Sequence, residues 1–122
     1  MATKEIAARL VELCRQGQFE TAQKELYATD ATSTEPAGAQ APPFVAGLDG
    51  IIEKGHQFQA MLEAVHGITI SDPVIAEDYF SISLIMDVTM KGMGRIPMSE
   101  ICLYRTKDGK VVSEQFFYSS NM

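Results

Sequence analysis

The sequence predicts a single α+β domain, residues 1–122, in which helices come first and antiparallel strands follow. Three segments, 4–16, 18–28 and 48–65, repeat apolar residues at helical spacing. From residue 68 onward, apolar and polar residues alternate instead, as they do in strands with one buried face. A chain of 122 residues is long enough for one hydrophobic core and too short for two.

The first two helices are expected to be close neighbours. Ile6, Leu10 and Leu13 share one face of the first segment, and Gly17 is a typical C-terminal stop. Segment 18–28 begins almost at once, so the two helices are expected to form a hairpin or to cross steeply.

A stretch rich in Pro and Gly separates this pair from the third helix. Residues 31–35 are rich in Ser and Thr and precede a proline, so they are expected to form a short strand. Residues 36–47 are expected to form a loop with a short extended piece at Phe44 and Val45. The apolar stripe of the third helix, 48–65, consists of Ile51, Phe58, Leu62 and Val65.

The last third of the chain is expected to form an antiparallel meander. Its strands are expected at 68–76, 78–90, 95–107 and 110–119. Asp72 and Pro73 interrupt the first of these strands. Asp108 and Gly109 form a typical two-residue hairpin turn, because both residue types tolerate positive φ.

This turn sets a register for the last hairpin. If Lys107 pairs with Lys110, then Leu103 faces Glu114, although a β-bulge would shift this pairing. The face expected beneath the helices comprises Phe80, Ile82, Leu84, Met86, Val88, Ile101, Leu103, Val112, Phe116 and Tyr118, with Arg105 and Glu114 nearer the turn.

The opposite sheet face mixes polar and apolar side chains. It is expected to carry Ser81, Ser83, Ile85, Asp87, Met98, Glu100, Cys102, Tyr104, Ser113, Gln115 and Phe117. A broad mixed face on a curved sheet is typical of a subunit interface, so we expect a homodimer through this sheet face. The alternative is a half-hydrated face in a monomer.

Charge narrows the classes of partner. The chain has 10 Lys and Arg against 16 Asp and Glu, which gives a net charge of −6. Such an acidic chain is not expected to bind nucleic acid or an anionic membrane surface. It has no apolar stretch of signal-peptide or membrane-spanning length, so a cytoplasmic location is expected.

The few potential metal ligands show no ligand spacing. Cys14, Cys102, His56 and His66 are far apart in the sequence, so no metal site is expected. The two cysteines are expected to be small buried groups in a reducing compartment. No glycine-rich nucleotide motif is present either, and no cofactor is expected.

Three stretches carry a resemblance to a known family. They are LYATDATSTEP after the helix pair, VAGLDGIIEKGHQF at the third helix, and YRTKDGKVVSEQFFYS at the end. Together they resemble the SnoaL-like branch of the nuclear-transport-factor-2-like superfamily, which is related to polyketide cyclases and ketosteroid isomerases. The resemblance implies a cone-shaped fold in which three N-terminal helices pack on a curved, mainly antiparallel sheet and enclose an apolar pocket.

This resemblance implies a chemical role for one residue, Glu35. The Asp-Ala-Thr lead-in and the Glu-Pro pair in LYATDATSTEP resemble the ketosteroid isomerase stretch that carries the catalytic carboxylate. The resemblance implies that Glu35 is a general base, and a shielding cone would make such a carboxylate a better base. The alternatives are a solvated residue at the strand end or an ion pair with Lys54.

The other isomerase groups do not carry over. That family has a Tyr on the first helix and a protonated Asp on an inner strand as oxyanion donors. The corresponding places fall near Leu10 and near Ile101, Cys102 or Leu103, none of which can stabilise an enolate in that way. Ketosteroid isomerase activity itself is therefore not expected.

Five further side chains are expected to bind a small hydrophobic ligand within the cone. They are Phe58, Met86, Glu114, Phe116 and Tyr118. Glu114 would need a partner if buried, and Arg105 could supply one, although an ion pair between them at the exposed rim is favoured. Two functions stay open: cofactor-free proton-transfer catalysis of the cyclase or isomerase type, and a non-catalytic module for ligand binding or dimerisation.

Overall fold

The computed structural model describes residues 1–39 and 41–119, which fold into three helices and seven strands in that part of the chain. The helices are α1 (Thr3–Arg15), α2 (Phe19–Leu26) and α3 (Leu48–Ala60). The strands are β1 (Tyr27–Thr34), β2 (Phe44–Ala46), β3 (Leu62–Ile70), β4 (Val74–Ala76), β5 (Tyr79–Met90), β6 (Gly94–Lys107) and β7 (Lys110–Phe117).

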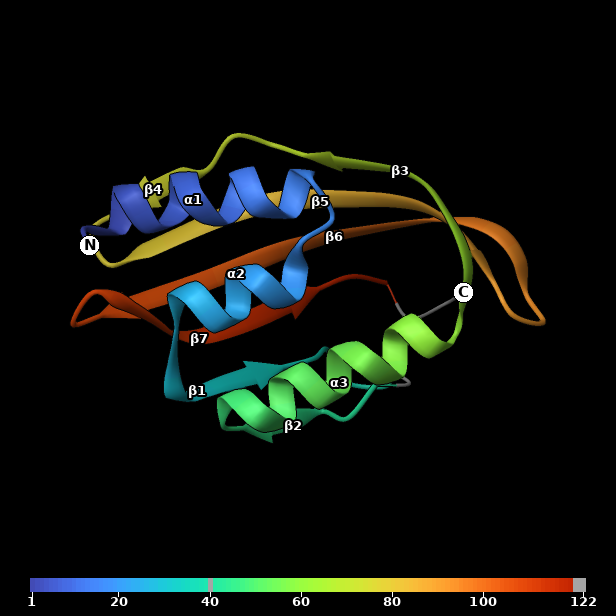
Figure 1. The fold of residues 1–122 in the computed structure, drawn as a ribbon, viewed down its shortest axis with the longest axis horizontal. Helices are drawn as coiled ribbons and strands as arrows, with labels where there is room; N and C mark the ends of the chain where they lie inside the picture. The colour runs from blue at the N-terminus through green and yellow to red at the C-terminus, as the bar shows by residue number, and fades with distance from the viewer. Residues whose placement is uncertain (40, 120–122) are drawn as a thin grey trace.

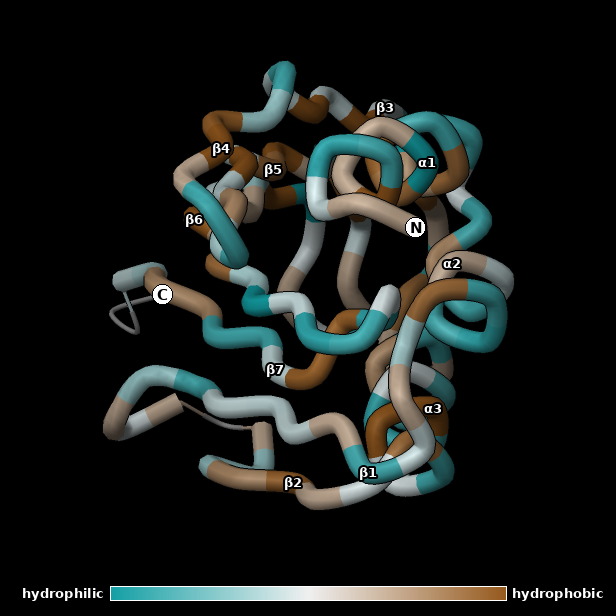
Figure 2. The backbone as a smooth tube through the Cα atoms, turned by 90° about the vertical axis from the view of Figure 1, so that its left-hand side faces the viewer, coloured by the Kyte–Doolittle hydropathy of each residue, from teal (hydrophilic) through white to brown (hydrophobic). Residues whose placement is uncertain are grey.

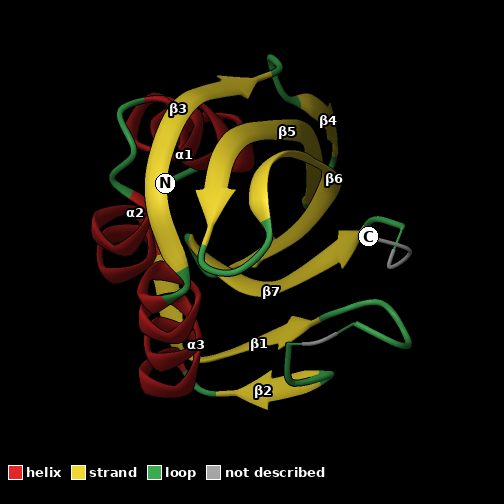
Figure 3. Cartoon of the chain, turned by 90° about the vertical axis from the view of Figure 1, so that its right-hand side faces the viewer, coloured by secondary structure: helices red, strands yellow, loops and turns green. Residues whose placement is uncertain are grey.

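All seven strands belong to one sheet with the order β2-β1-β7-β6-β5-β3, while β4 pairs with β5 (Figure 1). Every pairing is antiparallel except that of β1 with β7. The sheet curves strongly, and the three helices lie along one side of it (Figure 3). The predicted α+β class and mainly antiparallel sheet are therefore confirmed.

The helices are amphipathic and seal the concave side of the sheet. Their polar and apolar residues alternate along the turns in Figure 2. α1 buries Ile6 and Leu10 against β3 and β5, and α3 buries Ile51 while packing against β1. The short link at Gly17, which has a φ of 75°, turns the chain directly from α1 into α2.

The third helix is shorter than predicted. It ends at Ala60, and the segment expected to complete it forms β3, which pairs with β5. Leu62 and Val65 fit a helical stripe, but β3 also contains Ile68 and Ile70, and pairing with a long neighbouring strand outweighs local spacing. The second helix likewise ends at Leu26, so that β1 begins earlier than the predicted strand at residue 31.

A β-bulge corrects the predicted register of the last hairpin. Lys107 pairs with Lys110 as predicted, but the register shifts between Arg105 and Thr106, so that Glu114 lies opposite Tyr104 rather than Leu103. A slip of one residue exchanges the two faces of a strand.

The assignment of β6 side chains to the two faces was therefore wrong. Ile101 is 48% exposed on the outer face, whereas Cys102 is 1% exposed and lies on the inner face. The predicted inward residues Leu103 and Arg105 alternate outward with Ile101. The inner face instead receives Met98, Glu100, Cys102 and Tyr104. The alternation predicted for β5 is correct, since Phe80, Ile82 and Val88 are buried.

Candidate functional site

A cavity of about 400 Å³ lies between the helices and the inner face of the sheet. Most of its walls are apolar. The apolar and aromatic lining includes Leu10, Phe19, Ile51, Phe58, Met61, Ile82, Leu84, Met86, Met98, Tyr104 and Phe116. Three carboxyl groups and one ammonium also line it, those of Glu35, Glu100, Glu114 and Lys54. Such a cavity, apolar with a few polar groups, has the general character of a small-molecule site.

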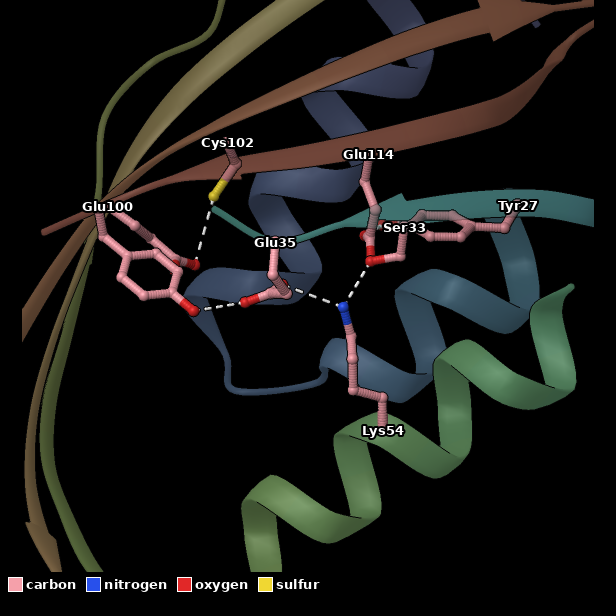
Figure 4. A network of polar contacts seen from close by, with 8 residues as sticks. Tyr27, Ser33, Glu35, Lys54, Glu100, Cys102 and Glu114 are labelled. Carbon is pink, nitrogen blue, oxygen red and sulfur yellow. Dashed lines mark hydrogen bonds and ion pairs between the residues drawn. The ribbon is translucent and has the colours of Figure 1, made fainter. Parts of the chain in front are cut away.

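Glu35 stands directly after β1, at the edge of this cavity. Its backbone N–H donates to the carbonyl of Pro43 at 3.0 Å, which fixes the start of the loop. Its carboxylate accepts a hydrogen bond from the Tyr118 hydroxyl at 2.6 Å and lies 3.0 Å from Lys54 Nζ (Figure 4). Only 8% of the Glu35 side chain is exposed, so it is shielded rather than solvated, and the ion pair with Lys54 that was left open is present.

Lys54 connects the carboxylates of the site. It comes from α3, and its side chain is 14% exposed. Its ammonium donates to Glu35 Oε2 and, at 2.6 Å, to Ser33 Oγ. It also lies 5.2 Å from the centre of the Phe116 ring, within cation–π range. These contacts hold the ammonium in place beside the base candidate.

Glu114 is the innermost carboxyl group. It is 3% exposed and accepts hydrogen bonds from the hydroxyl of Tyr27 and, at 2.7 Å, from that of Ser33. Because an ammonium can only donate, Ser33 accepts from Lys54 and directs its own proton to Glu114. Burial raises the pKa of Glu114, while the two hydroxyl donors oppose that rise.

The ion pair that the sequence predicts between Glu114 and Arg105 does not form in the structure. Arg105 lies on the outer face and bonds to Asp78 at 3.1 Å. The bulge in the last hairpin explains this outcome, because it turns Arg105 outward while Glu114 points inward. Tyr27, at the start of β1, is one of the two donors to the buried carboxyl group.

Glu100 is a cavity residue that the predicted register placed on the wrong face. Its carboxyl group accepts a long hydrogen bond from the Cys102 thiol at 3.5 Å. Burial raises the pKa of Glu100 to about 7, with the charges of Glu35 and Glu114 adding to the effect. The regular alternation of Glu100, Cys102 and Tyr104 was visible in the sequence, but the pairing of β6 with β5 and the bulge beside β7 decide which face they share.

The structure brings all six predicted site residues to one cavity. Its lining contains Glu35, Phe58, Met86, Glu114, Phe116 and Tyr118. Burial and the nearby Glu35 carboxylate raise the pKa of Tyr118, so its hydroxyl is a donor at neutral pH. What these side chains do for a ligand stays a prediction.

Within the part of the chain that the structure describes, no group of three or more His, Cys, Asp or Glu side chains has the arrangement of a metal site. Residues 1–39 and 41–119 also contain no helix of the length and apolarity that crossing a membrane requires. The polar groups that line the cavity include carboxylates, a lysine and tyrosines, and a shielded carboxylate is suited to moving a proton.

Comparison with known proteins gives a consistent result. The profile of the family described as the SnoaL-like domain matches residues 1–118. A crystal structure of a candidate SnoaL-like polyketide cyclase from Mesorhizobium loti is 33% identical, with a TM-score of 0.90 over 97% of this chain and 100% of that one. The comparison with curated proteins gives no match.

Two more distant structures share the fold. An NTF2-like protein from Burkholderia thailandensis is 16% identical, with a TM-score of 0.85 over 98% of this chain and 92% of that one. TerC, crystallised with polyporic acid, is 15% identical, with a TM-score of 0.77 over 96% of this chain and 90% of that one.

Proposed function

Since the chain belongs to the SnoaL-like domain family, we propose that it binds a hydrophobic, carbonyl-bearing small molecule in its cavity and moves a proton on that molecule. Glu35 acts as the base, and no cofactor takes part. This is proton-transfer catalysis of the cyclase or isomerase type. Phe58, Met86 and Phe116 supply apolar contacts with the ligand.

The observation that carries this proposal is the position of Glu35. Its carboxylate is shielded from water, is held by Lys54 and Tyr118, and lines an otherwise apolar cavity. Each carboxylate oxygen accepts one of these bonds and retains a second lone pair. Glu35 can therefore take a proton from carbon without first losing its supports.

The reaction at Glu35 is a simple transfer. The carboxylate removes a proton from the carbon next to the ligand's carbonyl group. The electron pair of the C–H bond forms a carbon–carbon double bond, while the π electron pair of the carbonyl group moves onto its oxygen. Glu35 then returns the proton to the same or a neighbouring carbon. Lys54 and Tyr118 keep the carboxylate oriented during both steps.

A second candidate function is ligand binding without turnover. It is favoured because both oxygens of Glu35 already have partners, and because apolar Leu10 stands where the isomerases have a hydroxyl donor. Crystallisation of TerC with polyporic acid supports small-molecule binding by this fold under either function.

Isotope exchange distinguishes turnover from binding. Acetylnaphthalene, a flat hydrophobic methyl ketone, is incubated with the protein in deuterium oxide, and loss of its methyl proton signal is followed by NMR. The proposal predicts exchange with the wild-type chain and strongly reduced exchange with Glu35→Gln. Glu63→Gln, which changes an exposed carboxyl group on β3, is the matched control. Binding of the ketone without exchange would favour the second function.

We further propose a homodimer through the outer face of the sheet, in the cytoplasm. With the corrected register, this face exposes Ile85, Ile101 and Phe117 on three adjacent strands. Apolar side chains grouped on a surface are typical of protein interfaces. Free, buried Cys14 and Cys102 support a reducing compartment.

A further inference from the structure

Glu100 is a half-buried carboxyl group without a cationic partner among the described residues. It projects from β6 into the cavity, and its pairing partner on β5 is the apolar Leu84. Its hydrogen-bond partner within the chain is the thiol of Cys102, which is a weak donor at 3.5 Å. A carboxyl group that lines an apolar cavity normally has strong donors or a counter-charge, so Glu100 has bonding capacity left for a ligand.

The other two carboxyl groups of the cavity differ from Glu100 in this respect. Glu35 bonds to an ammonium and a phenol, and Glu114 bonds to two hydroxyl groups. Glu100 and Lys54 lie on opposite sides of Glu35 in Figure 4. Among the described residues, the one ammonium that lines the cavity therefore serves Glu35 and, through Ser33, Glu114, while Glu100 is left without such support.

We propose that Glu100 binds the carbonyl oxygen of the ligand as a neutral carboxylic acid, with its O–H group as the donor. This inference rests on the proposed function and adds the group that stabilises the negative charge created by Glu35. The ligand then places its carbonyl oxygen toward Glu100 and the adjacent carbon toward Glu35.

The charges around Glu100 favour its neutral form. The titratable groups that face it come from several elements. They are Glu35 directly after β1, Lys54 on α3, Cys102 on β6, Glu114 on β7, and Tyr118 directly after β7. The two carboxylates oppose ionisation of Glu100, while Lys54 and the Cys102 thiol favour it. Burial is the largest effect and also opposes ionisation, which raises the pKa of Glu100 to about 7.

The combined step is balanced without a further reactant. Glu35 takes the proton from carbon, the C–H electron pair forms the C=C bond of the enolate, and the carbonyl π pair moves onto the oxygen. Glu100 donates a hydrogen bond or its proton to that oxygen. When Glu35 returns its proton to carbon, the electron pair leaves the oxygen and Glu100 recovers its starting state. Two carboxyl groups in different surroundings can thus act as base and acid in one cavity.

The test uses two probes with the same skeleton, acetylnaphthalene and naphthylethylamine. The first offers a carbonyl acceptor, and the second offers a cation to an ionised carboxylate. Affinities are measured by fluorescence for the wild-type chain, Glu100→Gln, Glu100→Leu and the exposed-site control Glu63→Gln. Glutamine keeps a donor without a titrating proton, while leucine removes the donor and keeps an apolar wall.

The proposal predicts that the ketone binds the wild-type chain about tenfold more tightly at about pH 6 than at about pH 8, since the acid form is lost over that interval. Glu100→Gln should bind the ketone at both pH values without this dependence, and Glu100→Leu should bind it weakly at both. The Glu63→Gln control should behave as wild type.

Several results would overturn the proposal. One is tighter binding of the amine than of the ketone, together with loss of amine binding in Glu100→Gln. Another is ketone binding by Glu100→Leu with the wild-type affinity. The third is a wild-type chain that does not bind the ketone at either pH. Failure of the proposed function is separable from these results. Ketone binding that depends on Glu100 without isotope exchange would reject catalysis and keep this inference, whereas exchange unaffected by Glu100→Leu would reject this inference alone.

Discussion

The ammonium of Lys54 lies 3.0 Å from Oε2 of Glu35 in a nearly closed environment, with 14% and 8% of the two side chains exposed. The same ammonium donates to Ser33, which in turn donates to Glu114. One cation therefore compensates two carboxylates that come from different parts of the fold. The bond from Lys54 to Ser33 also links α3 to β1, two elements that pack against each other.

Replacement of Lys54 by methionine should destabilise the protein. Removing one member of a buried ion pair leaves an uncompensated charge, which costs about 3 kcal/mol. Urea unfolding followed by circular dichroism measures this difference. Lys24→Met, which breaks an exposed pair with Glu20, should cost little.

Replacement of Tyr27 by phenylalanine should weaken the support of Glu114. The hydroxyl of Tyr27 donates to a fully buried carboxyl group, and a bond to such a charged acceptor is worth about 2 kcal/mol. The cost should fall at low pH, where Glu114 is neutral. Thermal unfolding at several pH values checks this. An equal cost at every pH would mean that Glu114 is already neutral across the range.

Glu100 should make the stability of the wild-type chain fall as the pH rises. Its pKa is raised from the ordinary value of 4.5 to about 7, so its contribution is fully present below 4.5 and is lost as the pH rises through 7. A difference of one unit between the pKa of the folded and the unfolded chain corresponds to about 1.4 kcal/mol of stability, so the whole loss is about 3 kcal/mol. Glu100→Gln should lack this component. Denaturation at about pH 4 and about pH 8 measures it, and parallel curves for the two proteins would contradict the prediction.

A charge on the outer sheet face should prevent dimerisation. Ile101 is 48% exposed between strands that also expose Ile85 and Phe117, so Ile101→Lys would place an ammonium within the proposed interface. Light scattering should give twice the 13.4 kDa chain mass for wild type and a single chain mass for the variant. Thr29→Lys, at an exposed position on β1, should stay dimeric. A monomeric wild type would reject the dimer.

Sequence periodicity was most informative where one pattern ran long enough. The alternation from Phe80 to Val88 correctly assigned the inner face of β5, because a twelve-residue strand with one buried face repeats every second residue. It failed at the end of α3, where Leu62 satisfies both helical and strand spacing. Pairing with β5 decides between the two, and that pairing is a long-range contact.

The candidate site was predicted in part for the same reason. Glu35, Phe58 and Phe116 reach the cavity because their own faces were assigned correctly. Glu100 was missed because two long-range pairings fix the face of β6. Met90 pairs with Gly94 on the β5 side, and a bulge follows Arg105 on the β7 side; no local feature of the sequence marks either. The partners of Glu114 were missed because they lie more than eighty residues away in the chain.

The rate of methyl-proton exchange in acetylnaphthalene, compared between the wild-type chain and Glu35→Gln, is the most direct test of proton transfer by Glu35. A general base contributes about 10²–10⁴-fold, so exchange should fall by at least about a hundredfold in Glu35→Gln while ketone affinity changes little. Glu63→Gln should exchange at the wild-type rate. Equal exchange by the wild-type chain and Glu35→Gln would contradict the assignment of Glu35 as the base.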